Sequence, residues 1–539
     1  SMAAIDDGSN TYNLIKSGSG TLTLTGSNGY DGTTTISAGT LTVTGTLDNN
    51  TAVTVSSGAT YDVDASDTIS SLAGAGTIDI ASSQTLTAGN SSDQEISGTI
   101  TGSGTFNKNG TGKLTLSGTG TDVGSIIVSN GTIEVSGQLN SGSYSGNITS
   151  RSALIFSPSS DQTISGVIAS SGTVTKSGSS TLTLSGTNTY TGATSINAGT
   201  LTVSGTLSDS TAVTVASGAV YDVDATDTVA SIEGAGNIEI ASSQTLTAGD
   251  ANNKTLSGVI SGSGGFTKAG SGTLTLSSTN TFSGITTINA GTLTVTGALS
   301  DSSAVSVASG AIYDVDASDT VASIEGAGNI EIASSQILTA GDSNNKTLSG
   351  VISGSGGFTK TGSGTQTLSG NNSFSGATNI NSGTLTVTGT LSDSTAVTVA
   401  SGAVYDVNAS DTVASISGAG NIEIASSQTL TAGDSNDKTL SGVISGSGSL
   451  TKAGSGTQTL SGTNTYTGAT TVSAGTLTVT GSLSDSTAVS VASGAVYDVD
   501  ASDTVASING AGNIEIASSQ TLTAGDGSDK TLSGVISGS

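Results

Sequence analysis

A five-residue element, Gly-Thr-Leu-Thr-Val, recurs along the chain at a nearly constant spacing. Its copies begin at Gly39, Gly199, Gly291, Gly383 and Gly475, and a variant, Gly-Thr-Ile-Glu-Val, begins at Gly131. The steps between successive copies are 92, 68, 92, 92 and 92 residues. A fixed long period indicates an array of structural repeats, in which each unit buries its apolar face only by stacking on its neighbours. The repeat therefore constrains the fold more strongly than the length of 539 residues does.

The repeat continues without a visible domain boundary. No proline-rich linker, shift of composition or block of charge divides the chain. We therefore predict one continuous solenoid over residues 1–539 rather than several globular domains. The predicted units are 1–38 (partial), 39–130, 131–198 (short), 199–290, 291–382, 383–474 and 475–539 (partial). Because the sequence opens inside one repeat and stops short of another, we expect it to be part of a longer protein.

Within each unit, Val, Ile and Leu alternate with Thr in short runs bounded by Gly, Asn, Asp and Ser. This alternation is typical of strands joined by turns, and no helical period is apparent. In the run from Tyr221 to Asp224, it places Tyr221 and Val223 on one face, which we assign to the interior. The two aspartates of that run, Asp222 and Asp224, then face outward.

The unit 199–290 divides at Gly-rich corners into four segments, which end at Gly218, Gly236, Gly264 and Ala290. Each segment holds two or three candidate strands, which suits one turn of a parallel β-helix. The predicted fold class is therefore all-β, a parallel β-helix of tandem units of about 92 residues with about four coils per unit. The short unit 131–198 lacks 24 residues, about one such coil, and the loss of a whole coil leaves strands in register. Five shorter coils also divide the unit, but then the deletion does not match a coil.

One position conflicts with a simple apolar interior. Leu274 is replaced by Gln366 and Gln458 in later copies. A buried Gln needs hydrogen-bond partners. Either this position lies near a corner and is partly exposed, or stacked amides bond to one another.

The segment from Leu450 to Gly481 resembles the passenger-associated transport repeat of bacterial autotransporters. It contains the Lys-x-Gly-x-Gly-Thr-x-Thr-Leu core, the Asn-x-Tyr/Phe-x-Gly turn and the closing Gly-Thr-Leu-x-Val. Close variants begin near Leu14, Phe106, Val174, Phe266 and Phe358. One variant departs from the pattern, with Asp122 in place of the aromatic residue and Asn109 within the Lys-x-Gly element. The resemblance implies a right-handed parallel β-helix that is secreted through an outer-membrane pore and displayed outside a Gram-negative cell, often as part of an adhesin.

Composition excludes several kinds of chemistry and of partner. The chain has no histidine and no cysteine, so Ser-His-Asp and Cys-His catalytic sets and histidine or cysteine metal sites are absent. The net charge of −28 disfavours nucleic acid and anionic membranes as partners. No run of 18 apolar residues occurs, so we expect no direct membrane insertion of this segment. We expect no cofactor and no enzyme activity.

Three side-chain groups that recur along the chain are candidates for chemistry, although the short unit 131–198 lacks the acidic one. The acidic cluster Asp222, Asp224 and Asp227 has copies at Asp62/Asp64/Asp67, Asp314/Asp316/Asp319, Asp406/Asp411 and Asp498/Asp500/Asp503. We interpret it as a solvated acidic face, with weak divalent-cation binding as the alternative; an active site is ordinarily single, so catalysis is disfavoured.

The other two recurring groups are lysines and aromatic residues. The lysines form two sets, Lys16, Lys108, Lys176, Lys268, Lys360 and Lys452, and Lys254, Lys346, Lys438 and Lys530. We interpret them as making local surface ion pairs, as between Lys254 and Asp250, with a glycan or protein contact as the alternative. The aromatic residues of the Asn-x-aromatic turn are Tyr30, Tyr190, Phe282, Phe374 and Tyr466. We interpret them as packing residues, with stacking on sugars as the alternative.

The short unit 131–198 is the one atypical unit, so we place a possible contact region there, at Tyr144, Arg151, Phe156 and Pro158. Because proline cannot donate to a strand ladder, Pro158 should lie where the wall deviates. We hypothesise a notch or protruding loop from about Ser141 to Ser160; the alternative is only a shorter repeat.

The sequence favours a non-enzymatic, secreted or cell-surface rod, stalk or adhesin segment of a large repetitive bacterial surface protein. A β-helical polysaccharide-active enzyme and an ice-binding solenoid are the alternatives. The expected partner is an unknown surface ligand, a glycan or a protein, or a second copy of the chain.

Overall fold

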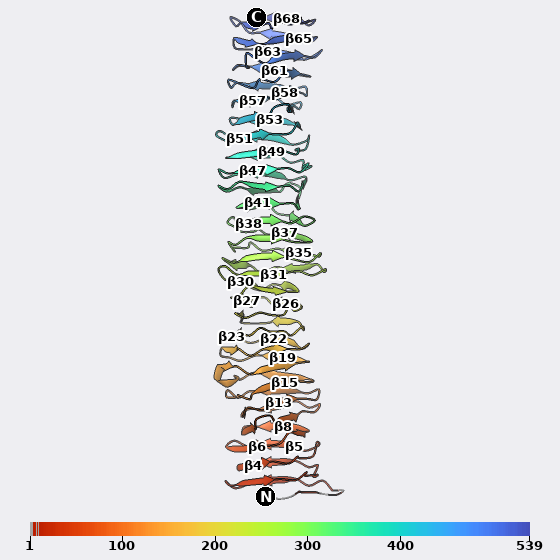
Figure 1. The fold of residues 1–539 in the computed structure, drawn as a ribbon, viewed down its shortest axis with the longest axis vertical. Helices are drawn as coiled ribbons and strands as arrows, with labels where there is room; N and C mark the ends of the chain where they lie inside the picture. The colour runs from red at the N-terminus through yellow and green to blue at the C-terminus, as the bar shows by residue number, and fades with distance from the viewer. Residues whose placement is uncertain (1–3, 7, 9, 539) are drawn as a thin grey trace. The chain divides into compact units, whose positions relative to one another are not determined.

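The computed structural model describes residues 4–6, 8 and 10–538, and it contains two compact units, 1–266 and 267–539. Each unit is a stack of short parallel strands joined by tight corners (Figure 1). The predicted all-β solenoid is confirmed for each unit. The prediction of one continuous solenoid stays a prediction. No helix in the described residues is long and apolar enough to cross a membrane.

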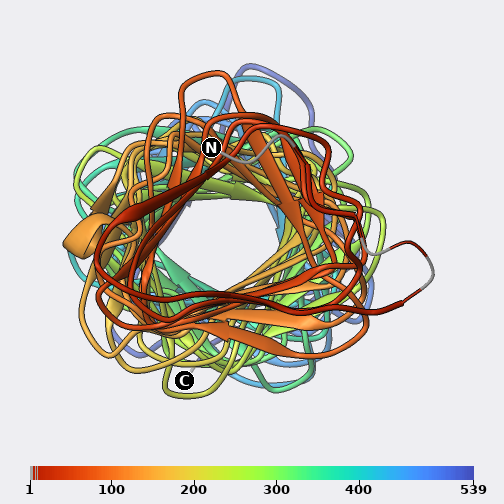
Figure 2. The same ribbon diagram turned by 90° about the horizontal axis from the view of Figure 1, so that it is seen from below.

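One repeat of the second unit illustrates the element order. Its strands are short and pair only in parallel. They are β37 (Thr292–Val295), β38 (Ala304–Val307), β39 (Ile312–Val315), β40 (Asp319–Val321), β41 (Ser323–Gly326), β42 (Asn329–Ile332), β43 (Ile337–Ala340), β44 (Lys346–Leu348), β45 (Ile352–Gly354), β46 (Gly357–Lys360), β47 (Thr365–Leu368) and β48 (Thr378–Ile380). Every third segment along the chain falls on the same wall, so each coil has three walls (Figure 2).

Contacts between neighbouring coils give the length of a coil. β37 pairs with β39, and within this pair the hydroxyl of Thr294 donates to Asp314, 20 residues further along the chain. On another wall, Lys346 bonds to Glu325 across a separation of 21 residues. The expected coil, a quarter of the repeat, is therefore too long, and the alternative, a fifth of the repeat, is too short. The error arose because Gly-rich corners occur inside a coil as well as between coils.

The interior is built by the predicted alternation. In β27 (Val220–Val223) of the first unit, Tyr221 and Val223 are fully buried while Asp222 is on the outer face. Their neighbours on adjacent coils are also apolar, because Tyr221 pairs with Leu201 on the preceding coil and Ile238 on the following one. Each coil thus closes its core against the next one, and stability is a sum over neighbouring coils.

Glycine is needed where the chain turns tightly between walls. Gly234 has φ of 122°, and a Cβ there would lie 2.1 Å from the carbonyl oxygen of Val215 on the preceding coil. Both the backbone conformation and the close approach of the two coils exclude a side chain. Close contact between coils at such positions explains why an ordered chain contains so much glycine.

A 92-residue repeat is not a whole number of coils. In the second unit, the Gly-Thr-Leu-Thr-Val strands β37, β49 (Thr384–Val387) and β61 (Thr476–Val479) belong to three different sheets. β37 lies beside β39 and β42, β49 lies beside β47 and β51 (Val404–Val407), and β61 lies beside β59 (Thr457–Leu460) and β63 (Val496–Val499). Each repeat has 14 segments, counting twelve strands and two isolated bridges, which is four and two-thirds coils. Equivalent residues of successive repeats therefore lie on successive walls.

The short unit 131–198 is also not a whole number of coils. From β16 (Thr132–Val135) to β25 (Thr200–Val203) the chain advances by ten segments instead of 14, counting the bridge at Leu139 and the strand β17 (Ser143–Tyr144) as one segment. The 24 missing residues thus amount to one coil and a third. The expected loss of one whole coil is therefore wrong. The strands nevertheless stay in register, because the deletion removes complete segments, each a strand with its corner.

Candidate functional site

The structure separates the acidic cluster that the sequence suggested. Asp222 and Asp224 are on the outer face, whereas Asp227 begins β28 (Asp227–Val229) and points inward, with 3% of its surface exposed. The interpretation as one solvated acidic face is therefore wrong for Asp227. Among the described residues, no group of three or more carboxylates is placed to hold a metal ion. The structure does not bring together the three weak metal candidates.

Asp227 links two coils through its carboxylate. Its two oxygens accept the backbone N–H of Leu207 on the preceding coil at 3.1 and 3.2 Å. One oxygen also accepts the N–H of Thr228 at 3.0 Å, and the other accepts the buried phenol of Tyr221 at 3.1 Å. The same contact to a tyrosine occurs in Asp67, Asp319, Asp411 and Asp503. This carboxylate replaces a strand hydrogen bond where the preceding coil has no strand on this wall.

Burial changes the acidity of these carboxyl groups. Desolvation raises the pKa of Asp227 to about 6, although the hydrogen bonds from Leu207, Tyr221 and Thr228 act in the opposite direction. Asp67, Asp319 and Asp411 also have a pKa raised to about 6 by the same cause. The group is thus built to be protonated in mildly acidic solution.

The first lysine set is also buried, contrary to the interpretation as surface ion pairs. Lys176 ends β22 (Thr173–Lys176) and has no exposed surface. Its ammonium donates to the carbonyl oxygens of Ser177 at 3.1 Å, Gly178 at 2.8 Å and Ala198 at 3.1 Å. The other five members, Lys16, Lys108, Lys268, Lys360 and Lys452, bond to equivalent carbonyls. Each lysine closes a corner and ties it to the next coil, one turn later.

The period-two alternation contained the signal for both buried groups. Lys176 stands two residues after the inward Val174, and Asp227 stands two residues before the inward Val229. The sequence interpretation gave residue type more weight than position. Their recurrence at one fixed position per unit was the second signal, since surface charges are free to vary.

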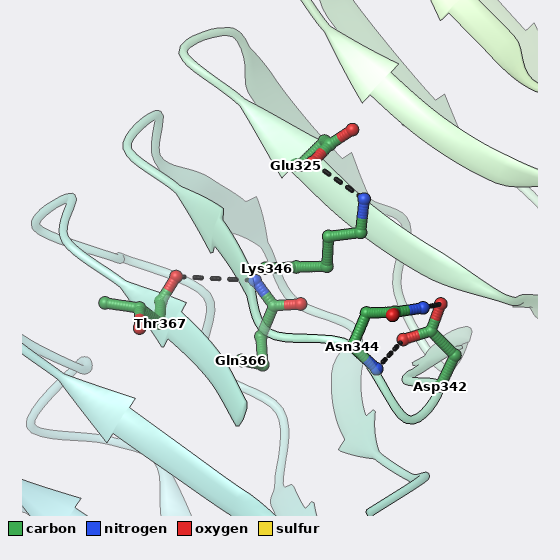
Figure 3. Close-up of polar contacts among 6 residues, drawn as sticks. All are labelled: Glu325, Asp342, Asn344, Lys346, Gln366 and Thr367. Atoms are coloured by element: carbon green, nitrogen blue, oxygen red, sulfur yellow. Dashed lines mark hydrogen bonds and ion pairs between the residues drawn. The ribbon is translucent and has the colours of Figure 1, made fainter. Parts of the chain in front are cut away.

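The second lysine set does form surface ion pairs: Lys530 pairs with the aspartate four residues earlier, Asp526, at 3.6 Å, as interpreted, whereas Lys254 and Lys346 each pair with a glutamate on another coil. Lys254 pairs with Glu233 at 2.9 Å and Lys346 with Glu325 at 2.9 Å, rather than with the aspartate four residues earlier (Figure 3). That aspartate, Asp342 in the second unit, accepts the backbone and side-chain N–H groups of Asn344. Partly exposed pairs of this kind contribute at most about 1 kcal/mol.

The glutamines that replace Leu274 in later copies, Gln366 and Gln458, find their hydrogen-bond partners in the backbone. Gln366 in β47 is 1% exposed, so the corner interpretation is wrong. Its amide nitrogen donates to the carbonyl oxygen of Thr367 at 3.3 Å (Figure 3), and that of Gln458 donates to Thr459 and Lys438. The side chains bond to main-chain carbonyls instead of to one another, so no amide stack is formed.

The turn aromatics are packing residues, as interpreted. Tyr190 and Phe282 have no exposed surface, and Tyr30, Phe374 and Tyr466 are equally buried. They fill the interior of the solenoid rather than its edge, and their rings cannot reach a sugar. Tyr190 also donates or accepts a hydrogen bond with Thr194 at 2.7 Å.

The predicted contact region of the short unit is mostly interior. Tyr144, Phe156 and Pro158 are buried, and only Arg151 is exposed. Pro158 lies between strands, as expected, and its carbonyl accepts the hydroxyl of Ser180 at 2.7 Å. A ligand contact in this region stays a prediction. Of the four residues, only Arg151 has an exposed side chain that could make it.

The hypothesised loop from Ser141 to Ser160 is not formed. The wall deviates only at a 3-10 turn, η1 (Asn140–Gly142), which lies on its outside at the left of Figure 2. From there the chain enters β17, β18 (Asn147–Ser150) and β19 (Ala153–Phe156). The alternation of inward and outward residues in this stretch suffices to keep it in the wall.

One surface feature was missed by sequence reasoning. At the Asn-x-aromatic turn the wall lacks a strand for two coils, and Thr187 meets Thr206 only through an isolated bridge. The buried amide of Asn188 supplies the missing bonds: it accepts the N–H of Ile168 at 3.0 Å and donates to the carbonyls of Gly186 and Thr206. The wall opens here into a groove.

The groove has a volume of about 390 Å³ and is lined by Thr187, Asn188, Thr189, Thr206, Leu207, Ser208 and Asp209. An equivalent groove of about 420 Å³ lies nearer the start of the chain, at Ser27, Asn28, Gly29, Thr46, Leu47 and Asp48, and extends over the next two coils. The same Asn bonds recur at Asn280, Asn372 and Asn464. The signal in the sequence was the Asn of five of the turns, which lies at the segment without strand alternation; the turn with Asp122 has Gly120 at this position.

Comparison with known proteins bears on the repeat itself. The family model of the passenger-associated-transport-repeat matches residues 14–43, 106–135, 174–203, 266–295, 358–387 and 450–479. Searches of curated proteins and of solved structures found no match. Each matched segment runs from the strand that ends in the buried lysine to the end of the Gly-Thr-Leu-Thr-Val strand, or of its variant. The resemblance stated from the sequence is confirmed: the chain carries six passenger-associated-transport-repeats.

Proposed function

We propose that this chain is a non-enzymatic segment of an autotransporter passenger or large repetitive adhesin, exposed at the bacterial cell surface. It acts there as a stalk that supports attachment or display. The observation that carries the proposal is the regularity of the repeat: each full-length repeat adds 14 segments to the stack and contains one transport repeat. At about 4.8 Å per coil, a repeat adds roughly 22 Å of height with an unchanged cross-section.

The fate of the ionisable side chains supports a structural role. Glycan-cleaving β-helices need a pair of carboxylates that both face the substrate. Here Asp227 is buried and bonded to a neighbouring coil, and only Asp222 and Asp224 of the cluster face outward. The buried lysines are likewise used to close corners. Asp227 and these lysines therefore hold the coils together, and of the outward pair that remains, Asp222 accepts a hydrogen bond from the hydroxyl of Thr202 on the preceding coil.

The outer ladders support the proposal over the ice-binding alternative. Ice-binding solenoids need threonines on consecutive coils. In the first unit, Thr183 and Thr202 are adjacent on one wall, but the next two coils place Asp222 and Glu239 there. In the second unit, Thr275 and Thr294 are followed by Asp314 and Glu331 in the same way.

Attachment and surface exposure are tested separately. Beads coated with the chain are expected to adhere to epithelial cells or mucin above beads coated with albumin. Antibodies to the chain should label intact cells of the source bacterium without permeabilisation. Hydrolysis of acidic polysaccharides by the purified chain would favour the enzyme alternative, and beads that adhere no better than albumin would remove the adhesive role.

A further inference from the structure

The groove at Asn188 is an opening in the wall, and an equivalent groove lies at Asn28. We propose that it is a binding site for a neutral, hydroxyl-rich ligand, a segment of a glycan, and that it occurs at each of the five turns that carry this Asn. The inference rests on the proposed function, since it names the ligand class through which the chain would attach.

The lining selects the class of ligand. Thr187 and Thr189 are exposed hydroxyls on one side, and Ser208 and Asp209 face them from the next coil. Hydroxyl groups both donate and accept, and the carboxylate accepts from paired hydroxyls, which is the complement of a sugar ring. Among the described residues, no lysine or arginine lines this groove or the equivalent groove at Asn28, so neither offers a partner to phosphate, sulfate or sialic acid.

The groove is unsuited to an apolar peptide. Leu207 is the one large apolar side chain of its described lining, and only 3% of its surface is exposed. A peptide that docks through apolar side chains would find no pocket to fill. The volume of about 390 Å³ lies within the range of small-ligand sites, and an open groove suits one segment of a longer chain.

The floor of the groove is rigid before any ligand arrives. The amide of Asn188 is 2% exposed and makes three hydrogen bonds to the backbone of its own and adjacent coils. Leu207 is fixed by the carboxylate of Asp227. A ligand therefore orders little of the protein when it binds, and weak polar contacts suffice for measurable affinity.

The phase of the repeat sets how the sites are displayed. In the second unit the turns with Asn280, Asn372 and Asn464 are one repeat apart, so each lies about 22 Å further along the stack and on a different wall. The aspartate equivalent to Asp209 recurs at Asp301, Asp393 and Asp485. Such sites capture separate glycan chains from several sides, and their number raises avidity.

The test uses an array of neutral, sialylated and sulfated glycans probed with the whole chain. We expect binding to neutral glycans and a loss of at least tenfold in apparent affinity when the groove is changed in all repeats, for example Thr187→Ala, Thr189→Ala and Asp209→Ala in the first unit with their equivalents. The matched control removes exposed groups outside the grooves, Thr54→Ala, Thr214→Ala and Asp224→Ala, and should bind as the wild type. If the groove variant is misfolded by circular dichroism, Thr189→Arg with its equivalents blocks the groove without removing a bond from its floor.

The outcomes separate this inference from the proposed function. Binding only to charged glycans, binding that the groove variants retain, or no binding to any arrayed glycan overturns the groove assignment. In those cases beads that still adhere to cells leave the attachment role standing. Loss of neutral-glycan binding in the groove variants, with the control unchanged, supports the assignment.

Discussion

Lys176 and Asp227 are both charged residues buried in the wall, and each is bonded to different groups of the chain. Neither Lys176 nor Asp227 makes an ion pair in the part of the chain that the structure describes. Lys176 gives its three donors to three carbonyls, so the charged form is fully bonded. Asp227 receives two N–H groups and one phenol, which do not offset the loss of water, and its pKa rises to about 6. Desolvation also lowers the pKa of Lys176, so both sites disfavour the charged form; the sites differ in that carbonyls bond to the cation, whereas N–H groups and a phenol bond to the anion.

The largest expected effect comes from removing a caged lysine. Lys176→Met keeps the length of the side chain but leaves three partly buried carbonyls without this donor. We expect a loss of about 3 kcal/mol in the free energy of unfolding, measured by urea denaturation. The control is Lys254→Met, which breaks the surface pair with Glu233 and should cost less than about 1 kcal/mol. Equal losses in the two variants would show that the carbonyl cage contributes nothing of its own.

The next effect is a dependence on pH that the aspartates impose. The pKa of Asp67, Asp227, Asp319 and Asp411 is about 6 in the folded state and 3.8 in the reference state. The folded state therefore binds more protons between these values, so the free energy of unfolding falls as pH rises from about 4 to about 6 and is level above. Each carboxyl contributes about 3 kcal/mol at most. We expect a melting temperature several degrees higher at pH 4.5 than at pH 7.5; a higher value at pH 7.5 would contradict the direction.

Replacing the aspartates isolates their share of that dependence. An asparagine at Asp67, Asp227, Asp319, Asp411 and Asp503 is neutral at every pH, and its oxygen can still accept the N–H of the preceding coil. We expect this five-fold variant to be at least as stable as the wild type at pH 7.5 and to lose most of the gain at pH 4.5. The control is Asp224→Asn with its equivalents on the outer face, which should leave the dependence unchanged. A variant that keeps the full dependence would assign it to the net charge instead.

A smaller effect is expected where Phe replaces Tyr at the turn. Tyr190 and Tyr466 bond to the hydroxyls of Thr194 and Thr470, whereas Phe374 leaves the buried hydroxyl of Thr378 without a partner in the described residues. Phe374→Tyr should restore that bond and raise the free energy of unfolding by about 1 kcal/mol. The reciprocal change, Tyr190→Phe, should lower it by a similar amount. If both changes lower stability, the pocket at Phe374 has no room for the hydroxyl.

The sequence predicted the class of fold because the strands and turns of the solenoid follow local residue patterns. Alternation assigned Tyr221 and Val223 to the interior, and the turn aromatics were correctly taken as packing residues. The coil length was beyond reach, since three similar walls accept the same segment and nothing local marks where a turn of the solenoid closes. The buried Lys176 and Asp227 were misjudged because their partners are backbone groups of another coil, which no side-chain pattern reveals. The groove was missed for the same reason, as it exists only where two coils without strands are stacked.

The central claim is that a repeat spans four and two-thirds coils, and a pair of distances tests it directly. In the second unit, Ser306 and Asp406 lie on the same wall, five coils apart, through the register Ser306, Glu325, Thr347, Thr367, Thr386 and Asp406. Thr398 is the equivalent of Ser306 in the next repeat but belongs to another sheet, beside Asn379.

Spin labels introduced at these outward positions of the whole chain can be measured in pairs by pulsed electron resonance. The account predicts a distance of roughly 24 Å between the labels at Ser306 and Asp406, and a longer distance between Ser306 and Thr398, although that pair is closer in the sequence. A Ser306–Thr398 distance shorter than the Ser306–Asp406 distance would place equivalent residues on one wall and contradict the account.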